Sequence, residues 1–118
     1  MDDEALWAFE ERFWTGGEDH YRSTLDPACI MAFPAPVGIM SGSAIVQSLV
    51  GAPRWSSVAF SDRKVARPNA QTIVLGYRAV GQREGSKPYE AYCTSSYRGS
   101  ESGWKLFQHQ QTPIRISA

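Results

Sequence analysis

The sequence predicts an α+β fold in which helices near the N-terminus cover one face of a curved antiparallel sheet. Two observations predict this architecture: helical spacing of apolar residues dominates the first half of the chain, and four β-rich segments fill the second half. Charged side chains within those strands supply a third observation, because they indicate which face of the sheet is buried. A chain of 118 residues has room for one such domain, which we expect to span residues 1–118.

The first predicted helix spans residues 2–14. Its apolar residues Leu6, Phe9 and Phe13 recur at helical spacing, and acidic residues crowd the first turn, where the helix dipole favours them. A Gly-Gly pair at residues 16–17 supplies the end of the helix. We therefore expect an amphipathic helix whose apolar stripe is buried.

Two further short helices and a strand complete the first half of the chain. Residues 18–25 (EDHYRSTL) predict the second helix, and residues 28–34 (ACIMAFP) predict a short strand that ends at proline. Ser43 fits the N-cap position of a third helix, which ends near Gly51.

The second half of the chain predicts four strands, at residues 55–67, 71–83, 89–99 and 103–114. Turns rich in Pro, Asn, Gly and Ser separate them. Successive strands joined in this way favour an antiparallel meander.

Charged residues within the strands predict which face is buried. Arg78, Arg98 and Lys105 should point away from the helices, because a buried unpaired charge is very costly. Alternation along the strands then sends the following residues inward: Ile73, Leu75, Tyr77, Ala79, Ala91, Cys93, Ser95, Tyr97, Trp104, Leu106, Gln108 and Gln110. The outer face is unusually apolar and aromatic, which indicates an interface. We expect a homodimer through Val74, Tyr92, Thr94, Phe107, His109 and Gln111.

Inward-facing amides on the last strand predict an internal pocket. Gln108 and Gln110 would lie beside small residues, which leaves space where a filled core needs bulk. An unpartnered buried amide costs about 1–3 kcal/mol, so these amides need ligand, water or side-chain partners. The alternative is a closed hydrogen-bond network within a solid core. We expect a small, largely apolar ligand to contact Trp14, Tyr21, Met31, Phe33, Met40, Trp55, Tyr77, Tyr97, Trp104, Gln108 and Gln110.

Four motifs in order carry a resemblance to a known superfamily: ALWAFEERFWTGG at residues 5–17, DHYRSTLDPACIMAFP at residues 19–34, GIMSGSAIVQSL at residues 38–49, and a closing Trp-Lys-Leu strand followed by HQQTP. On these motifs the chain resembles the nuclear transport factor 2-like superfamily, and within it the SnoaL-like (polyketide cyclase-like) proteins and domains of unknown function. The resemblance covers nearly the whole chain, and the last strand is its most specific part.

The resemblance implies a cystatin-like cone, in which a strongly bent antiparallel sheet wraps around the first helix and encloses a cavity, commonly in a homodimer. The superfamily includes ketosteroid isomerase, scytalone dehydratase, limonene epoxide hydrolase and polyketide cyclases, as well as members that only bind or assemble. Such breadth means that the fold alone does not name the function. We therefore weigh three functions: ligand binding, acid-base catalysis of the isomerase, dehydratase or cyclase type, and non-catalytic dimerisation.

Enzymes of this superfamily are expected to use an Asp, His or Tyr in the cone for acid-base chemistry. The inward strand positions predicted above hold neither a carboxylate nor a histidine, which weakens the enzyme hypothesis. The remaining catalytic candidates are Asp19, His20, Tyr77 and Tyr97. For Asp19 and His20, a solvated helix start is the competing interpretation, and Asp26 fits a turn before proline.

Composition limits the partners. Twelve basic residues balance twelve acidic ones without a basic cluster, so we expect neither a nucleic-acid nor a membrane partner. Two distant cysteines and two distant histidines predict no metal site and no disulfide, and nothing in the sequence calls for a cofactor. The acidic start of the chain is unlike a secretion signal, and we expect a cytoplasmic protein.

Overall fold

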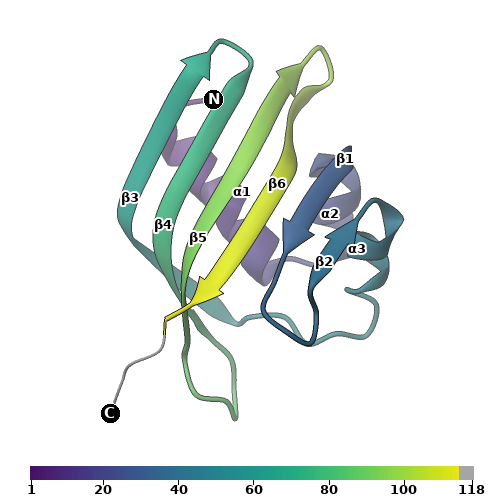
Figure 1. Cartoon of the computed structure of the whole chain (residues 1–118), viewed down its shortest axis with the longest axis vertical. Helices are drawn as coiled ribbons and strands as arrows, with labels where there is room; N and C mark the ends of the chain where they lie inside the picture. Colours follow the sequence, from purple (N-terminus) through teal and green to yellow (C-terminus); the bar gives the residue numbers. More distant parts are fainter. Residues whose placement is uncertain (115–118) are drawn as a thin grey trace.

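The computed structural model describes residues 1–114, which form a six-stranded sheet with helices on one face (Figure 1). The helices are α1 (Asp3–Thr15), α2 (Glu18–Thr24) and α3 (Ser43–Gln47). The strands are β1 (Leu25–Ala32), β2 (Ile39–Ser41), β3 (Ser57–Asn69), β4 (Thr72–Gln82), β5 (Tyr89–Ser100) and β6 (Gly103–Pro113). The α+β architecture predicted from the sequence is confirmed.

Helix α1 begins and ends where its sequence directs. The Asp2 side chain caps it by accepting a hydrogen bond from the Ala5 N–H at 2.8 Å. At the other end, the Gly16 N–H donates to the Arg12 carbonyl. A Cβ atom at Gly16 would lie 2.6 Å from that carbonyl oxygen, so only glycine fits here. Helix α1 therefore ends at Thr15, and the chain turns at Gly16 and Gly17 into α2.

The strands lie in the order β2-β1-β6-β5-β4-β3. Strands β3 to β6 pair antiparallel with their neighbours, which confirms the predicted meander. Strand β1 pairs parallel with β6, and the short strand β2, which the sequence did not predict, pairs antiparallel with β1. Figure 1 shows α1 crossing behind the meander, with α2 and α3 near β1 and β2.

Side-chain alternation in β4 and β5 is as predicted. The residues expected to point inward from these two strands are buried: Ile73, Leu75, Tyr77, Ala79, Ala91, Cys93, Ser95 and Tyr97. On the outer face, Arg78 pairs with Glu90 at 2.8 Å. The charged residues therefore identified the outer face correctly along these two strands.

A bulge in β6 reverses the alternation and overturns part of the prediction. In β5 the adjacent residues Ser96 and Tyr97 pair with Gln108 and Leu106 of β6. Phe107 is therefore an extra residue in β6, with no partner of its own in β5. Beyond this bulge Gln108 and Gln110 lie on the outer side, so the prediction that they point inward is wrong. His109 is buried instead.

The two displaced glutamines have partners on the outer side of the sheet. Gln108 accepts a hydrogen bond from Ser96 Oγ at 2.8 Å and donates to Thr94 Oγ1 at 3.3 Å. Gln110 donates to Thr112. His109 and Gln111 were also predicted on the outer face, and this is wrong because both line a cavity on the inner side of the sheet. Val74, Tyr92, Thr94 and Phe107 are partly or well exposed, as predicted for that face.

The hydrophobic core lies between α1 and the concave face of the sheet. Leu6, Phe13 and Trp14 from the helix meet Leu75 and Tyr97 from the strands, and all of them are buried. Among residues 1–114, no helix has the length and apolar character needed to cross a membrane.

Candidate functional site

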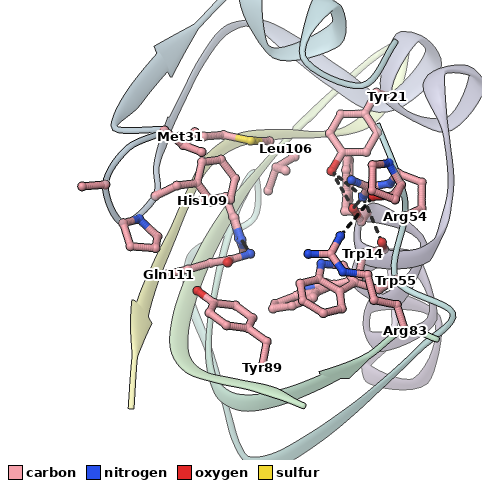
Figure 2. Close-up of a pocket in the computed structure, with 16 residues that line it drawn as sticks. Trp14, Tyr21, Met31, Arg54, Trp55, Arg83, Tyr89, Leu106, His109 and Gln111 are labelled. Carbon is pink, nitrogen blue, oxygen red and sulfur yellow. Dashed lines mark hydrogen bonds between the residues drawn. The ribbon is translucent and has the colours of Figure 1, made fainter. Parts of the chain in front are cut away.

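An open cavity of about 330 Å³ lies at the end of the sheet where β6 terminates and the β4–β5 connection begins. Its apolar wall includes Phe13, Trp14, Met31, Phe33 and Leu106. Figure 2 shows Tyr89, His109 and Gln111 on one side of the hollow, and Arg54, Trp55 and Arg83 on the other. The remaining lining residues are Tyr21, Pro34, Ala35, Val37 and Pro53.

Trp55 organises one side of the cavity. Its ring stacks on Tyr89, with centroids 5.4 Å apart and planes 14° apart, and the Arg83 guanidinium lies 4.2 Å from its centroid. Gly81 makes this position possible, because a Cβ atom there would approach Trp55 to 3.0 Å. The aromatic stack thus holds an arginine at the cavity wall.

Arg54 connects the cavity to the end of α1. Its Nη2 donates to the carbonyls of Phe13 and Trp14 at 2.6 and 2.9 Å, and its Nε donates to the Gly16 carbonyl at 2.8 Å. These carbonyls lack helical partners and lie at the negative end of the helix dipole, where a cation is favourable. The Tyr21 hydroxyl, which donates to Phe13, also accepts from Arg54 at 3.3 Å. Arg54 is therefore fixed in place.

Behind the cavity, Glu10 of α1 is fully buried in a cluster of hydroxyl donors. Ser95 Oγ donates to Glu10 Oε2 at 2.5 Å, and the hydroxyls of Tyr77 and Tyr97 donate to the same carboxyl group. Burial, followed by the charge of Glu10, raises the pKa of both tyrosines well above the usual value. Both hydroxyls therefore remain protonated donors at neutral pH.

His109 connects the Glu10 cluster to the cavity. Its Nδ1 lies 2.7 Å from Ser95 Oγ and 3.7 Å from Glu10 Oε2. The Ser95 hydroxyl donates its one hydrogen to Glu10, so it accepts a hydrogen bond from the Nδ1–H of His109. The other ring nitrogen, Nε2, then carries a lone pair, which faces the Gln111 amide at 3.0 Å. Burial lowers the pKa of His109, although the charge of Glu10 opposes this. A neutral imidazole, whose basic Nε2 accepts from the Gln111 amide, thus lies in the cavity wall.

The residues predicted to bind a ligand are divided among five places. Trp14, Tyr21, Met31, Phe33 and Trp55 line the cavity. Met40 lines a shallower neighbouring hollow that shares Met31 and Phe33. Tyr77 and Tyr97 belong to the Glu10 cluster behind the cavity wall. Trp104 packs over Gly99, and Gln108 and Gln110 lie on the outer side of the sheet.

The predicted catalytic candidates on α2 lie outside the cavity lining. Asp19 is exposed, and His20 packs against Phe9 and Phe13 with ring centroids 5.1 and 4.3 Å away. Burial and the nearby charge of Arg12 lower the pKa of His20 to about 4. His20 is thus a neutral, half-buried residue at pH 7 that packs against aromatic rings, whereas the competing interpretation placed it at a solvated helix start.

Asp26 is also structural. Its carboxyl group accepts from the Ala28 N–H and from Arg98, whose Nη2 lies 2.5 Å away. Burial alone would raise the pKa of Asp26, but these hydrogen bonds and the Arg98 charge together lower it.

Sequence reasoning missed Glu10, His109, Arg54 and Arg83. The signal for Glu10 was present, because it lies four residues after Leu6 and three before Phe13, on the buried stripe of α1. Nothing in the local pattern of the last strand marks the bulge that turns His109 inward. The prediction that the inward strand positions hold no histidine is therefore wrong, and the buried carboxylate, Glu10, comes from α1 and not from a strand.

No metal site is evident in the described part of the chain, where no three His, Cys, Asp or Glu side chains gather closely enough to hold an ion. Cys29 and Cys93 are buried free thiols, and burial raises the pKa of each to about 12. Neither thiol is therefore activated as a nucleophile.

Comparison with known proteins bears on the fold. No protein-family model matches the chain, and neither does any curated protein sequence. Among solved structures, a nuclear transport factor 2-like protein of unknown function in nutrient uptake from Rhodospirillum rubrum is similar with a TM-score of 0.77 at 22% identity, covering 97% of this chain and 100% of that one.

Two other similar structures have different names. A protein from Parabacteroides distasonis, provisionally named a ketosteroid isomerase, has a TM-score of 0.78 at 16% identity, covering 93% of this chain and 86% of that one. The calcium/calmodulin-dependent kinase II hub of S. rosetta has a TM-score of 0.74 at 18% identity, covering 94% and 92%. The chain therefore has the nuclear transport factor 2-like, or cystatin-like, fold, as the resemblance implied.

Proposed function

We propose that this protein binds a small, largely apolar organic molecule in the cavity between α1 and the end of the sheet. The observation that carries the proposal is the hollow of about 330 Å³, whose walls are mostly aromatic and aliphatic, with a few polar groups directed into it. Ligand sites in proteins have this size and composition.

Binding of phenylacetamide, followed by NMR, tests this proposal. This neutral aromatic probe fits an apolar site that offers a few hydrogen bonds. We expect saturable shifts of resonances from cavity residues such as Met31, and weaker binding by a Leu106→Trp variant that fills the space. Trp104→Phe, which changes a tryptophan outside the cavity lining, is the control. Shifts spread evenly over the surface, or no binding at millimolar concentration, would count against a ligand site.

A second candidate function is acid-base catalysis, which the geometry around His109 favours. Its Nε2 can accept a proton from a substrate C–H bond, and Ser95 and Glu10 can then stabilise the imidazolium that forms. Return of that proton to a different carbon completes an isomerisation without any other reactant. The structural similarity to the Parabacteroides distasonis protein is consistent with this chemistry.

Conversion of a β,γ-unsaturated cyclic ketone to its conjugated isomer, followed by ultraviolet absorbance, tests the catalytic candidate. We expect His109→Gln to remove the activity and Glu10→Gln to reduce it, while His20→Gln, outside the cavity lining, retains it. The rate should decrease as the pH falls through the lowered pKa of His109, because the protonated imidazole cannot act as a base. Equal rates for the wild type and His109→Gln would exclude this role.

We also propose that the chain forms a homodimer through the outer face of the sheet. Tyr92 is 56% exposed there, and Val74, Thr94 and Phe107 lie on the same face of the sheet. The similarity to a kinase hub domain supports self-association. We expect light scattering coupled to size-exclusion chromatography to give a dimer for the wild type and a monomer for Tyr92→Arg. A wild-type monomer at high concentration would refute the dimer.

We also propose that the protein is located in the cytoplasm. Both cysteines are buried free thiols, which suits a reducing compartment. Cell fractionation with an antibody against the native protein tests this location.

A further inference from the structure

We propose that the cavity selects ligands carrying a single carboxylate group, which Arg83 binds at the cavity mouth while an aromatic or alicyclic body enters between Met31 and Leu106. This inference rests on the proposed binding function and adds to it the charge and orientation of the ligand. It follows from the arrangement of donors, charges and apolar surface around the hollow.

The charge of the cavity wall is positive. Arg54 and Arg83 both line it, and no Asp or Glu is among its lining residues. Within residues 1–114, neither of these arginines forms a salt bridge, whereas Arg22, Lys64, Arg67, Arg78 and Arg98 each pair with a carboxylate. Both side chains are half-buried, and a bound anion stabilises a guanidinium group that lies beside apolar side chains.

Arg83 is the better placed of the two arginines to bind a ligand. The Nε and Nη2 groups of Arg54 are already bonded to carbonyls at the end of α1, which gives that side chain a structural role. Arg83 has one long hydrogen bond, from Nη1 to the Pro53 carbonyl at 3.3 Å. Its guanidinium is held 4.2 Å from the Trp55 centroid and points toward the hollow in Figure 2. A planar guanidinium fixed in this way presents paired donors that match a carboxylate.

Two further polar groups of the cavity wall add donors. The Tyr89 hydroxyl is buried and has no hydrogen-bond partner, which is unusual for a buried polar group. Burial raises its pKa to about 12, so it keeps its proton and can donate it. The Gln111 amide, which donates to His109, is on the same side of the hollow as Tyr89 (Figure 2). The donor groups of Arg83, Tyr89 and Gln111 that are available to a ligand therefore lie around one part of the hollow.

The opposite part of the cavity is apolar. Phe13, Met31, Phe33 and Leu106 present no side-chain hydrogen-bonding group other than the thioether of Met31. A ligand that is charged at both ends would leave one charge unpaired against these side chains, at a large desolvation cost. The geometry therefore favours a monocarboxylate with one apolar body.

A matched pair of probes tests this inference. Phenylacetate and phenylacetamide have the same ring and nearly the same shape but differ in charge, and isothermal titration calorimetry or NMR titration gives their dissociation constants. We expect the wild type to bind phenylacetate about tenfold more tightly, which is the scale of one charge-assisted hydrogen-bonded contact. Arg83→Gln should remove this preference and leave phenylacetamide binding nearly unchanged. Arg63→Gln, which changes an exposed arginine of β3 outside the cavity, should keep it.

The possible results separate this inference from the proposed function. Equal affinity of the wild type for the two probes would overturn carboxylate selection and leave ligand binding intact. A preference that persists in Arg83→Gln would also overturn it, because the charge would then be recognised elsewhere. Failure of both probes to bind would refute the cavity as a ligand site and the inference with it.

Discussion

Replacement of Glu10 by leucine should cost about 3 kcal/mol of folding free energy, although leucine is a good helix former and the site is fully buried. The carboxyl group accepts hydrogen bonds from Ser95, Tyr77 and Tyr97, and leucine would leave all three hydroxyls without this partner. Each unpartnered buried hydroxyl costs about 1–3 kcal/mol. Three such hydroxyls would cost about 3–9 kcal/mol, and removal of the buried charge relieves some desolvation, which places the expected loss at the low end of this range.

Urea denaturation at pH 7, followed by circular dichroism, measures this loss. Glu10→Gln keeps the shape and one acceptor oxygen, so we expect it to lose only about 1–2 kcal/mol. Glu11→Gln is the matched control, because Glu11 is the next residue of α1 and is exposed, and it should change the free energy of unfolding by less than about 0.5 kcal/mol. If Glu10→Leu proved as stable as the Glu11→Gln control, the hydroxyl cluster would not be a stabilising element of the fold.

Two further predictions concern pH and packing. The pKa of His20 is about 4 in the folded protein, against 6.5 for an unperturbed histidine, so the unfolded chain takes up the proton first. Stability should therefore be complete above pH 6.5 and decrease as the pH falls toward 4, and His20→Gln should flatten this decrease in urea titrations; an unchanged slope would contradict the assignment. Gly81→Ala should cost about 1–3 kcal/mol and displace Trp55, since the new methyl group would lie 3.0 Å from that ring. An unaltered Trp55 indole resonance with unaltered stability would contradict this close contact.

Much of the fold could be predicted from the sequence, because its physical causes are local. Helical spacing and a capping Asp2 define α1, and strict alternation with Arg78 facing outward defines the buried side of β4 and β5. The short strand β2 was missed because its three residues form a strand only by pairing with β1. Tertiary pairing, which no local pattern reveals, decides such an element.

The last strand could be predicted as a strand but not in its register. A single extra residue at Phe107 exchanges the two faces for everything that follows, so Gln108 moves outward and His109 inward. The bulge depends on how β6 pairs with β5, and an unbroken β-rich sequence contains no sign of it. The sequence therefore predicted Gln108 and Gln110 on the inner face and His109 on the outer face, and the structure shows the reverse.

Part of the candidate site could be predicted, and the rest depends on loops. Trp14 and Trp55 were expected at a pocket on the basis of size and apolar character, and both line the cavity. Arg54 and Arg83 lie in connecting segments, where charged residues are usually solvated, and only the folded chain places them at the same hollow. Charged loop residues such as Arg54 and Arg83 indicate a ligand site only when the positions of the strands that flank the loops are known.

The indole N–H resonances of the four tryptophans test the central claim, that this hollow is a ligand site, most directly. Trp14 and Trp55 line the cavity, whereas Trp7 and Trp104 do not. In a titration with phenylacetate, we expect saturable shifts of the Trp14 and Trp55 resonances with little change in the other two. Shifts confined to Trp7 or Trp104, or equal shifts of all four, would contradict it.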